Sequence, residues 1–220
     1  RGLGDVYKRQ VVDFRGRGIY WADIVSTVSE TYAREILTPE FGERLDPLLR
    51  DRRDRLFGIL NGIDYDVVNP ATDPHIAVQY DIQTLARRRE NKAALQREAK
   101  LLEEPDVPLL GIISRLNDAK GFDILGETVD HILDLGVQIV LMGTGEQHYH
   151  DLFGRMVEQY PQQVSIFLTF NTPLGQRIYA GSHMLLMPCR VEPCRTTQLV
   201  ALTYGCVTVV RAPGGLAEPV

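Results

Sequence analysis

The residues best suited to bind an anion follow five short apolar runs in the second half of the chain. Each run is followed by cations, by glycines, by an aromatic ring or by a polar loop. In chain order these residues are Arg115 and Lys120, then Gly143, Thr144 and Gly145, then Phe170, then Glu192 with Thr196 and Thr197, and finally Gly214 and Gly215. Two cations, glycine turns, a helix N-terminus and one aromatic ring together suit a nucleoside diphosphate. At an effective dielectric constant of about 20, each cation would contribute a few kcal/mol at most to a nearby phosphate.

The loop that carries Glu192 lies in the most informative stretch, MPCRVEPCRTTQLVALTYG at residues 187–205. An apolar run at residues 184–187 leads into a polar loop with a single acid, and a helix is predicted from about Thr196. Thr196 and Thr197 are expected to cap this helix. Its first N–H groups would have no partner within the helix, and the helix dipole favours negative charge there. Taken alone, the loop fits an ordinary strand-to-helix turn equally well.

The alternation of apolar runs and amphipathic segments after residue 107 predicts an α/β fold. Strands are expected at residues 109–114, 137–142, 164–168, 184–187 and 207–211, with helices at residues 122–135, 149–160, 174–180 and 196–204. Continuous apolar strands of this kind form a parallel sheet that is covered by helices on both faces. Ligands bind such a sheet beyond the carboxyl ends of its strands, so the residues above should meet at one edge.

The first half of the chain is predicted to form a smaller body followed by an irregular connection. Short strands are expected at residues 24–28 and 56–60, with a helix at 32–36 that Ser29 and Thr31 can cap, a charged, solvated helix at 46–55, and a longer helix at 85–102. Asn61 and Gly62 predict a tight turn after the second strand. Residues 1–10 resemble a cloning scar, and residues 61–74 are interpreted as a junction between two bodies.

Composition and charge argue against several classes of protein. The 220 residues carry a net charge of −5, so nucleic acid and anionic membranes are not favoured partners. No apolar run of about 18 residues occurs, and no membrane span is expected. Three cysteines without a CxxC pair suggest a reducing compartment, and a cytoplasmic location is expected. His148 and His150 could serve a metal, but an exposed helix start is the stronger interpretation, and no metal or other cofactor is expected.

The glycine patterns argue against two familiar nucleotide-binding classes. Gly143, Thr144 and Gly145 do not form the GxGxxG fingerprint of a NAD-dependent dehydrogenase, and the acid that follows that fingerprint is absent. No GxxxxGKS or GxxxxGKT sequence occurs, which argues against a P-loop ATPase.

Four longer segments together resemble one enzyme family. They are GILNGIDYDVVNPATDP at residues 58–74, NKAALQRE at 91–98, PLLGIISRLNDAKGFDIL at 108–125 and RIYAGSHMLLMPCRVEPCRTTQL at 177–199. They are similar to the bacterial glycogen synthases and plant starch synthases, retaining glycosyltransferases of family 5 with the GT-B fold of two Rossmann-like domains. The resemblance implies that residues 11–61 are the tail of the N-terminal domain, residues 62–106 the connection, and residues 107–220 a truncated C-terminal domain that binds the nucleotide sugar.

This family transfers glucose from ADP-glucose to the non-reducing 4-hydroxyl of an α-1,4-glucan, with retention of configuration and without a metal. By position, Arg115 and Lys120 match the pair that holds the donor diphosphate and neutralises the leaving ADP. Glu192 matches the acid that faces the donor glucose. The resemblance therefore implies these three catalytic residues, with ADP-glucose and α-1,4-glucan as partners.

The resemblance also implies a set of donor-binding residues. Cys194 matches a cysteine whose main chain lies beside the sugar, and Thr197 matches a threonine under the distal phosphate. Phe170 matches an aromatic residue that stacks on adenine, although the residue alone would be interpreted as part of the core. The complete predicted set is Gly143, Thr144, Phe170, Cys194, Arg195, Thr196, Thr197, Gly214 and Gly215.

Several residues around this site depart from the family pattern. Arg195 and Thr196 replace a glycine and a leucine of the Glu-Pro-Cys-Gly-Leu-Thr-Gln motif, Pro213 replaces a threonine, and Cys189 replaces a serine. If the glycine needs a positive φ, Arg195 is expected to strain the loop. A non-catalytic domain that binds nucleotide or glucan and another GT-B transferase stay open as alternatives. The family's N-terminal Lys-Thr-Gly-Gly-Leu loop is absent, so the chain alone is expected not to synthesise glucan.

Overall fold

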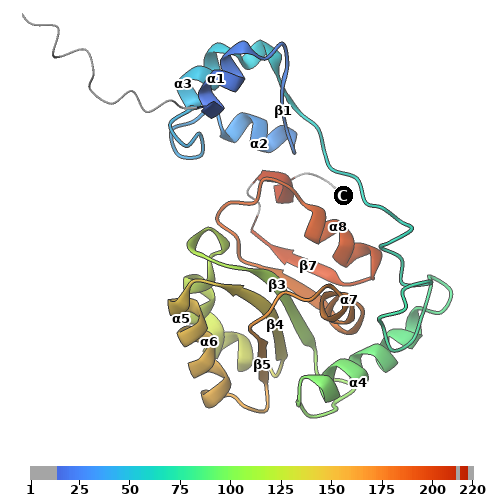
Figure 1. Ribbon diagram of the computed structural model, residues 1–220. Helices are drawn as coiled ribbons and strands as arrows, with labels where there is room; N and C mark the ends of the chain where they lie inside the picture. The colour runs from blue at the N-terminus through green and yellow to red at the C-terminus, as the bar shows by residue number, and fades with distance from the viewer. Residues whose placement is uncertain (1–13, 212–213, 218–220) are drawn as a thin grey trace, which may run out of the picture.

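The larger part of the chain is a five-stranded parallel sheet with helices on both faces, and a smaller body precedes it (Figure 1). The predicted α/β fold is thereby confirmed. The computed structural model describes residues 14–211 and 214–217. The predicted scar at residues 1–10 and the substitution at Pro213 lie outside these described residues.

The elements follow one another in the predicted order, with boundaries that differ by a few residues. The smaller body contains α1 (Phe14–Trp21), β1 (Val25–Thr27), α2 (Glu30–Glu35), α3 (Asp46–Asp51), the 3₁₀ turn η2 (Arg53–Arg55) and β2 (Leu56–Gly58). The larger body contains η3 (Leu85–Arg87), α4 (Arg88–Glu98), β3 (Leu109–Leu116), η4 (Asp118–Lys120), α5 (Phe122–Leu133), β4 (Gln138–Gly145), α6 (Gln147–Gln159), β5 (Val164–Phe167), α7 (Thr172–Gly181), β6 (Met184–Met187), α8 (Thr196–Thr203), β7 (Val207–Val210) and η5 (Gly214–Ala217).

The order of the strands marks one edge of the sheet as the place for a ligand. The sheet runs β5-β4-β3-β6-β7, and all neighbouring pairs are parallel. From β3 the chain builds outward through β4 and β5, then returns to the other side of β3 for β6 and β7. The loops after β3 and β6 therefore lead away in opposite directions. Open α/β sheets bind ligands at such a switch point.

Alternate residues of the central strands face two layers of helices, which produces the core. Ile112 and Leu141 pack beneath α5 and α6, whereas Leu109, Val140 and Met142 pack beneath α4 and α7 (Figure 1). Each fully buried aliphatic side chain of this kind stabilises the fold by about 1.5–3 kcal/mol. None of the helices in residues 14–211 and 214–217 is long and apolar enough to cross a membrane.

The glycine turn predicted after the second strand of the sheet is wrong. Residues 143–145 are the last three residues of β4 and pair with residues 114–116 of β3. A Cβ atom on Gly143 would lie 2.2 Å from Ser114 O, and one on Gly145 would lie 2.1 Å from Leu116 O. These glycines therefore allow a close approach of two strands, which is the other common meaning of glycine in a strand.

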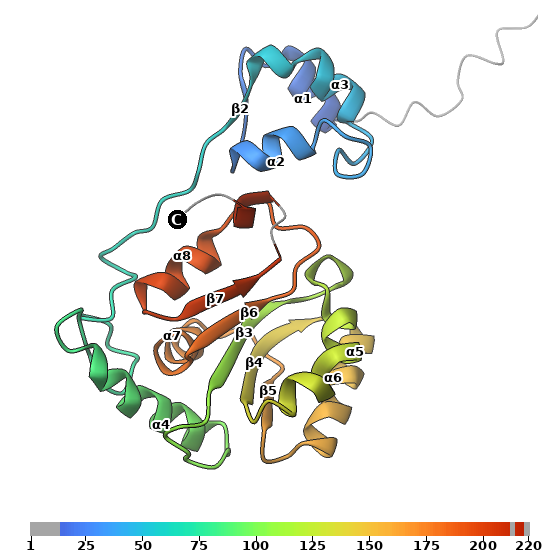
Figure 2. The ribbon, with the colours of Figure 1, turned by 180° about the vertical axis from the view of Figure 1, so that it is seen from behind.

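The tight turn predicted at Asn61 and Gly62 is also wrong. Residues 59–64 are irregular, and the connection runs from β2 down the side of the larger body to α4 (Figure 2). The physical reason is that β2 pairs only with the preceding strand β1 within residues 14–211 and 214–217. The chain after β2 therefore has no hairpin to close, and no two-residue turn is needed there.

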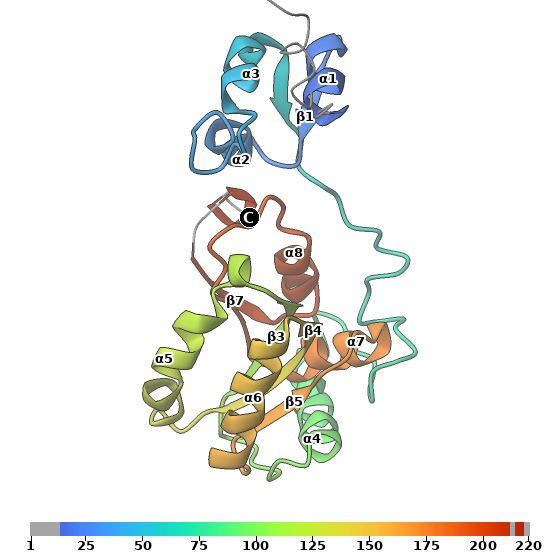
Figure 3. The ribbon, with the colours of Figure 1, turned by 60° about the vertical axis from the view of Figure 1, so that its left-hand side comes forward.

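The smaller body lies over the edge of the sheet at which η5 is found, with α2 facing η5 (Figure 3). Ser29 caps α2 as predicted, since its Oγ accepts a hydrogen bond from Tyr32 N at 2.8 Å. Near the end of α2, Glu35 Oε1 accepts a hydrogen bond from Gly214 N at 2.9 Å. This bond ties the smaller body to the loop region at the end of β7.

Buried tyrosines attach the connection to the larger body. Tyr80 Oη donates to the carbonyl oxygen of Tyr204 at 2.8 Å, and Tyr204 Oη donates to Asp73 Oδ2 at 2.6 Å. Burial raises the pKa of Tyr204, and the Asp73 carboxylate raises it further because it accepts the phenol proton. The connection is therefore anchored by two hydrogen bonds to Tyr204, the residue that follows α8, although it contains no long helix or strand before α4.

Candidate functional site

A cavity of about 260 Å³ lies beyond the carboxyl ends of β3 and β6, at the switch point of the sheet. Five of the predicted site residues line it: Arg115, Lys120, Phe170, Glu192 and Thr197. They come from the end of β3, from η4, from the loop before α7, from the loop after β6 and from the first turn of α8. The fold therefore brings together residues that the sequence places in five separate segments.

Lys120 and Glu192 form an ion pair in the cavity lining. Lys120 Nζ lies 2.7 Å from Glu192 Oε2, and the two side chains are 20% and 13% exposed. Partial burial reduces screening by water and salt, so this pair is stronger than one on the open surface. An incoming anion that approaches Lys120 has to share the ammonium group with Glu192.

The backbone holds the two loops of this ion pair against each other. Ala119 O accepts hydrogen bonds from both Arg190 N and Val191 N, at 2.9 Å and 3.2 Å. Gly121 follows η4 with a φ of 70°, and a Cβ atom there would lie 2.3 Å from Pro188 O. Only glycine meets both the backbone conformation and this close approach. The loop after β6 is thus fastened to the turn after β3.

Two thiols contact the carboxylate of Glu192. Cys189 Sγ lies 3.7 Å from Glu192 Oε2, and Cys194 Sγ lies 4.0 Å from Glu192 Oε1. Burial raises the pKa of the Cys189 thiol to about 11; Lys120 lowers that pKa in part, and Glu192 raises it. Cys189 therefore stays a neutral thiol near neutral pH. Cys189 was not among the predicted site residues, although its place in the motif was noted.

Arg115 and Phe170 present open side chains to the same cavity. Within residues 14–211 and 214–217, no hydrogen bond or ion pair engages the Arg115 guanidinium, which is exposed. Phe170 is 63% exposed and does not belong to the core. A free guanidinium and an open aromatic face are suited to a phosphate oxygen and a planar ring, respectively.

The N-terminus of α8 differs from its predicted capping. Arg195 is the N-cap residue and makes no side-chain capping bond, so the caps predicted at Thr196 and Thr197 are wrong. The strain predicted at Arg195 is wrong as well, because its φ of −116° is open to any residue. Thr196 is exposed, whereas Thr197 lines the cavity. Without a side-chain cap, the first N–H groups of α8 stay available to a ligand.

Tyr179 is a cavity residue that sequence reasoning missed. It lies in α7 and lines the cavity. Burial raises the pKa of Tyr179, and a hydrogen bond from the Thr197 side chain to its phenol oxygen lowers that pKa in part. The ring stacks on Tyr204 with 5.9 Å between the ring centroids. A tyrosine within a predicted helix is normally interpreted as a core residue, so no local feature of the sequence indicated that Tyr179 lines the cavity.

The remaining predicted residues surround the cavity without lining it. Gly143 and Thr144 lie in β4, and Thr144 is exposed. Gly215 N donates to the carbonyl oxygen of Glu192 at 2.9 Å, and a Cβ atom on Gly214 would lie 2.2 Å from that oxygen. The two glycines therefore support the main chain of the Glu192 loop.

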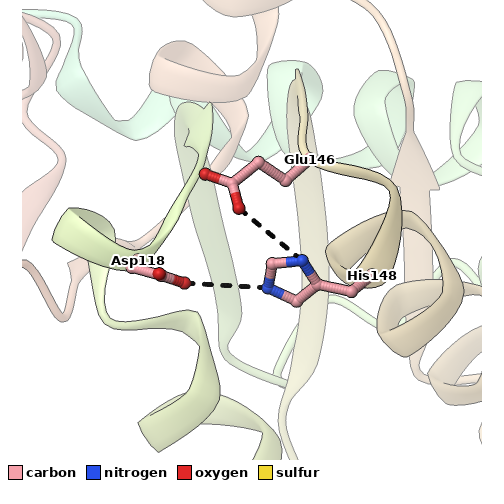
Figure 4. Close-up of side chains that lie close together, drawn as sticks. All are labelled: Asp118, Glu146 and His148. Atoms are coloured by element: carbon pink, nitrogen blue, oxygen red, sulfur yellow. Dashed lines mark ion pairs between the residues drawn. The ribbon is translucent and has the colours of Figure 1, made fainter.

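An exposed group of ionisable side chains lies beside η4 (Figure 4). His148 Nε2 lies 3.7 Å from Asp118 Oδ1, and His148 Nδ1 lies 3.6 Å from Glu146 Oε2. The ligand atoms of the three residues lie within 4.8 Å of one another. The imidazole presents both nitrogens to carboxylates, so the arrangement suits a solvated ion-pair network outside the cavity.

Two family models match the chain. The model described as "Starch synthase catalytic domain" matches residues 3–51, and the model described as "Glycosyl transferases group 1" matches residues 107–220. The glycogen synthase of Kosmotoga olearia is 50% identical over 217 residues, which cover 99% of this chain and 46% of that protein. The glycogen synthase of Moorella thermoacetica is 50% identical over 209 residues, which cover 95% of this chain and 43% of that protein. The chain therefore spans about half the length of the curated relatives that it matches.

Solved structures are similar over nearly the whole chain. The catalytic domain of Starch Synthase IV from Arabidopsis thaliana, bound to ADP and acarbose, aligns with a TM-score of 0.87 and 37% identity. The alignment covers 92% of this chain and 42% of that one. HepE from Anabaena, in complex with UDP and glucose, aligns with a TM-score of 0.61 at 18% identity, covering 91% of this chain and 47% of that one. The second likeness concerns the fold alone.

Proposed function

Because the chain belongs to the glycosyl transferases group 1 family and is related to the glycogen and starch synthases, we propose that it provides the donor-binding part of a glucosyltransferase. The proposed reaction transfers glucose from ADP-glucose to an α-1,4-glucan with retention of configuration. The observation that carries the proposal is the cavity at the switch point, where Arg115, Lys120, Glu192, Phe170 and Thr197 converge. ADP bound to the Arabidopsis starch synthase supports the choice of nucleotide.

In the proposed site, Arg115 and Lys120 bind the diphosphate of the donor. The bond from the anomeric carbon of glucose to the phosphate oxygen breaks during transfer, and negative charge grows on the departing ADP. Two fixed cations stabilise that charge more than they stabilise the bound donor, which lowers the barrier. Arg115 is free to bind at once. Lys120 is already oriented by Glu192, with 2.7 Å between their charged atoms.

Glu192 has the proposed role of facing the donor glucose while it orients Lys120. Its carboxylate accepts contacts from the lysine and from both neighbouring thiols, which fixes its direction at the cavity. The open ring of Phe170 is assigned to adenine, and the uncapped N-terminus of α8 with Thr197 to the distal phosphate. The predicted position of Cys194 beside the sugar and the predicted donor-binding roles of Gly214 and Gly215 are part of this proposal.

Titration calorimetry of ADP into the full chain tests the proposal. The wild-type chain is expected to bind ADP, and Arg115→Ala is expected to weaken binding by about 10–100-fold, since a charge-assisted hydrogen bond contributes about 1.5–3 kcal/mol. Arg155→Ala is the matched control, because Arg155 is an exposed arginine on α6 outside the cavity. Absence of ADP binding, or equal losses in the two variants, would contradict the proposal.

A transfer assay complements the titration. The chain alone is expected to bind ADP without moving glucose from ADP-glucose to glycogen, because the family motifs expected on the facing domain are absent from its sequence. Incorporation of labelled glucose into glycogen by this chain would contradict that expectation. Such a result would leave the donor-site assignment of Arg115 to be judged by the binding experiment.

A further inference from the structure

The loop between β6 and α8 places two cysteines around one carboxylate. Cys189 Sγ contacts one oxygen of Glu192 at 3.7 Å, and Cys194 Sγ contacts the other at 4.0 Å. Both thiols are reduced, and the third cysteine, Cys206, is buried at the start of β7. One carboxylate therefore lies within contact distance of both sulfur atoms.

The attachments of this loop decide which part of it can move. The main chain at Arg190 and Val191 is tied to Ala119 O by two hydrogen bonds. The stretch from Glu192 to Cys194 has no such tie to η4, and Gly215 N donates to Glu192 O from the other side. Cys194 can therefore approach Cys189 through a shift of residues 192–194, with little movement of the first half of the loop.

We propose that Cys189 and Cys194 form a reversible disulfide that displaces the Glu192 carboxylate and breaks its ion pair with Lys120. A disulfide holds its sulfur atoms about 2.05 Å apart. Glu192 belongs to the stretch that has to shift to bring the two sulfur atoms together, so closing the bond draws its carboxylate away from Lys120. Oxidation thus converts a paired Lys120 into an unpaired one, and it moves the acid of the candidate site.

The oxidant in the proposed step is a peroxide. Cys194 is the more exposed thiol, and its thiolate attacks one peroxide oxygen, forming a sulfenic acid and releasing water after protonation. Cys189 then attacks the sulfenic sulfur, the S–S bond forms, and the hydroxyl leaves as a second water. Two thiols lose two hydrogen atoms in total, and one hydrogen peroxide is reduced to two waters. Cys189 is buried and so takes the second, resolving position, which needs no direct access for the peroxide.

The bond itself is independent of the function proposed above, whereas its consequence for glucose transfer rests on that function. If the site binds ADP-glucose, the oxidised chain holds Glu192 away from the donor sugar and is the inactive form. A dithiol reductant returns the acid to Lys120 and restores the reduced site.

Peptide mapping of the peroxide-treated full chain tests the bond. Trypsin cuts after Arg177, Arg190, Arg195 and Arg211, so the three cysteines fall in the separate peptides 178–190, 191–195 and 196–211. The expected product is peptide 178–190 linked to peptide 191–195, two hydrogen atoms lighter than the sum of both, and separated again by dithiothreitol. Cys206→Ser is expected to keep this product, and Cys194→Ser to abolish it. A link to peptide 196–211, or no link after peroxide treatment, would overturn the proposal.

Amine labelling tests the displacement of Glu192 separately. An N-hydroxysuccinimide ester is expected to label Lys120 severalfold more in the oxidised than in the reduced chain, because the ammonium group loses its carboxylate partner. Lys100, which is exposed, is the internal control and should be labelled equally in both. Unchanged labelling of Lys120 in disulfide-linked chain would overturn the displacement. Neither readout needs a nucleotide, so failure of ADP to bind would be recognised as failure of the proposed function alone.

Discussion

Both bodies of the chain are built from alternating strands and helices, but the strands of the larger body are buried more completely than those of the smaller body. In the larger body, β3 and β4 are covered on both faces, and Leu141 has no exposed surface. In the smaller body, the sheet within residues 14–58 is the pair β1 and β2, and Trp21 is 78% exposed. Parallel sheets gain stability when both faces are covered. The larger body therefore has a core of its own, whereas the smaller one depends on few contacts.

The difference in burial between the two bodies also determines which of them carries the candidate site. Every residue that lines the candidate cavity belongs to the larger body. The smaller body reaches the region through Glu35, which accepts a hydrogen bond from Gly214 N. The next residue, Gly215, donates to the main chain of Glu192. A well-packed sheet thus fixes the site, and the smaller body is placed to adjust it.

The difference in packing predicts that a leucine-to-alanine substitution lowers the stability of the two bodies by different amounts. Leu141→Ala in β4 is expected to lower the free energy of unfolding of the larger body by about 2–5 kcal/mol, because it leaves a void in a fully buried layer. The matched change is Leu49→Ala in α3, a buried leucine of the smaller body. Urea unfolding followed by circular dichroism should show the main transition shifted by the first change and nearly unmoved by the second. Equal shifts would mean that the two bodies unfold as one unit.

The ion pair of the site should contribute measurably to the stability of the larger body. Glu192→Gln is expected to lower the free energy of unfolding by about 1.5–3 kcal/mol, since it leaves the half-buried Lys120 without its charged partner. Adding Lys120→Met should cost little more, because the unpaired charge is removed with it. A double-mutant cycle in urea gives the coupling energy directly. A coupling of zero would show that the pair orients nothing.

The contact between the bodies should be weaker than either effect. Glu35→Ala removes the acceptor of Gly214 N and is expected to weaken the docking of the smaller body by about 1 kcal/mol. Faster chymotrypsin cleavage at Leu60 or Tyr65, in the irregular connection, would report the looser docking. Glu40→Ala, an exposed glutamate of the same body, is the control. Identical cleavage rates in the two variants would show that Glu35 does not contribute to the docking of the smaller body.

The smallest expected effect is on how the free energy of unfolding changes at acidic pH. Arg190 lowers the pKa of Asp123 to about 2 from its ordinary value of 3.8. The unfolded chain then binds this proton more readily than the folded chain. The stabilisation is present above about pH 4 and is lost as the pH falls toward about 2. Asp123→Asn should therefore lose less stability than the wild type between about pH 4 and pH 2 in urea unfolding. Parallel curves would show that the exposed pair contributes nothing.

The sequence predicted the sheet well because burial leaves a clear pattern. The apolar runs at residues 109–114 and 184–187 match β3 and β6 closely, since strands covered on both faces are continuously apolar. The short strands of the smaller body were also found. Glycines were harder to interpret. Gly143 and Gly145 lie in a strand where two backbones approach, and the sequence alone could not distinguish this case from a turn.

The site was predicted in part, for a similar reason. Arg115, Lys120 and Glu192 follow strand ends, and the topology gathers strand ends at one edge. Tyr179 was missed because it reaches the cavity from the last turn of a helix, where the sequence indicates only a core residue. The caps expected at Thr196 and Thr197 failed because Arg195 takes the N-cap position with an ordinary backbone conformation. Local residue preferences cannot reveal contacts that depend on packing between distant elements.

A crystal structure of the full chain grown with ADP is the experiment that would locate the donor site. We expect the nucleotide in the cavity at the switch point, with its diphosphate within hydrogen-bonding distance of Arg115 and Lys120 and its adenine against Phe170. The electron density would also show whether Lys120 leaves Glu192 or bridges it to the phosphate. ADP bound elsewhere, such as at the groove that contains Asp118 and His148, would show that the assigned cavity is not the donor site.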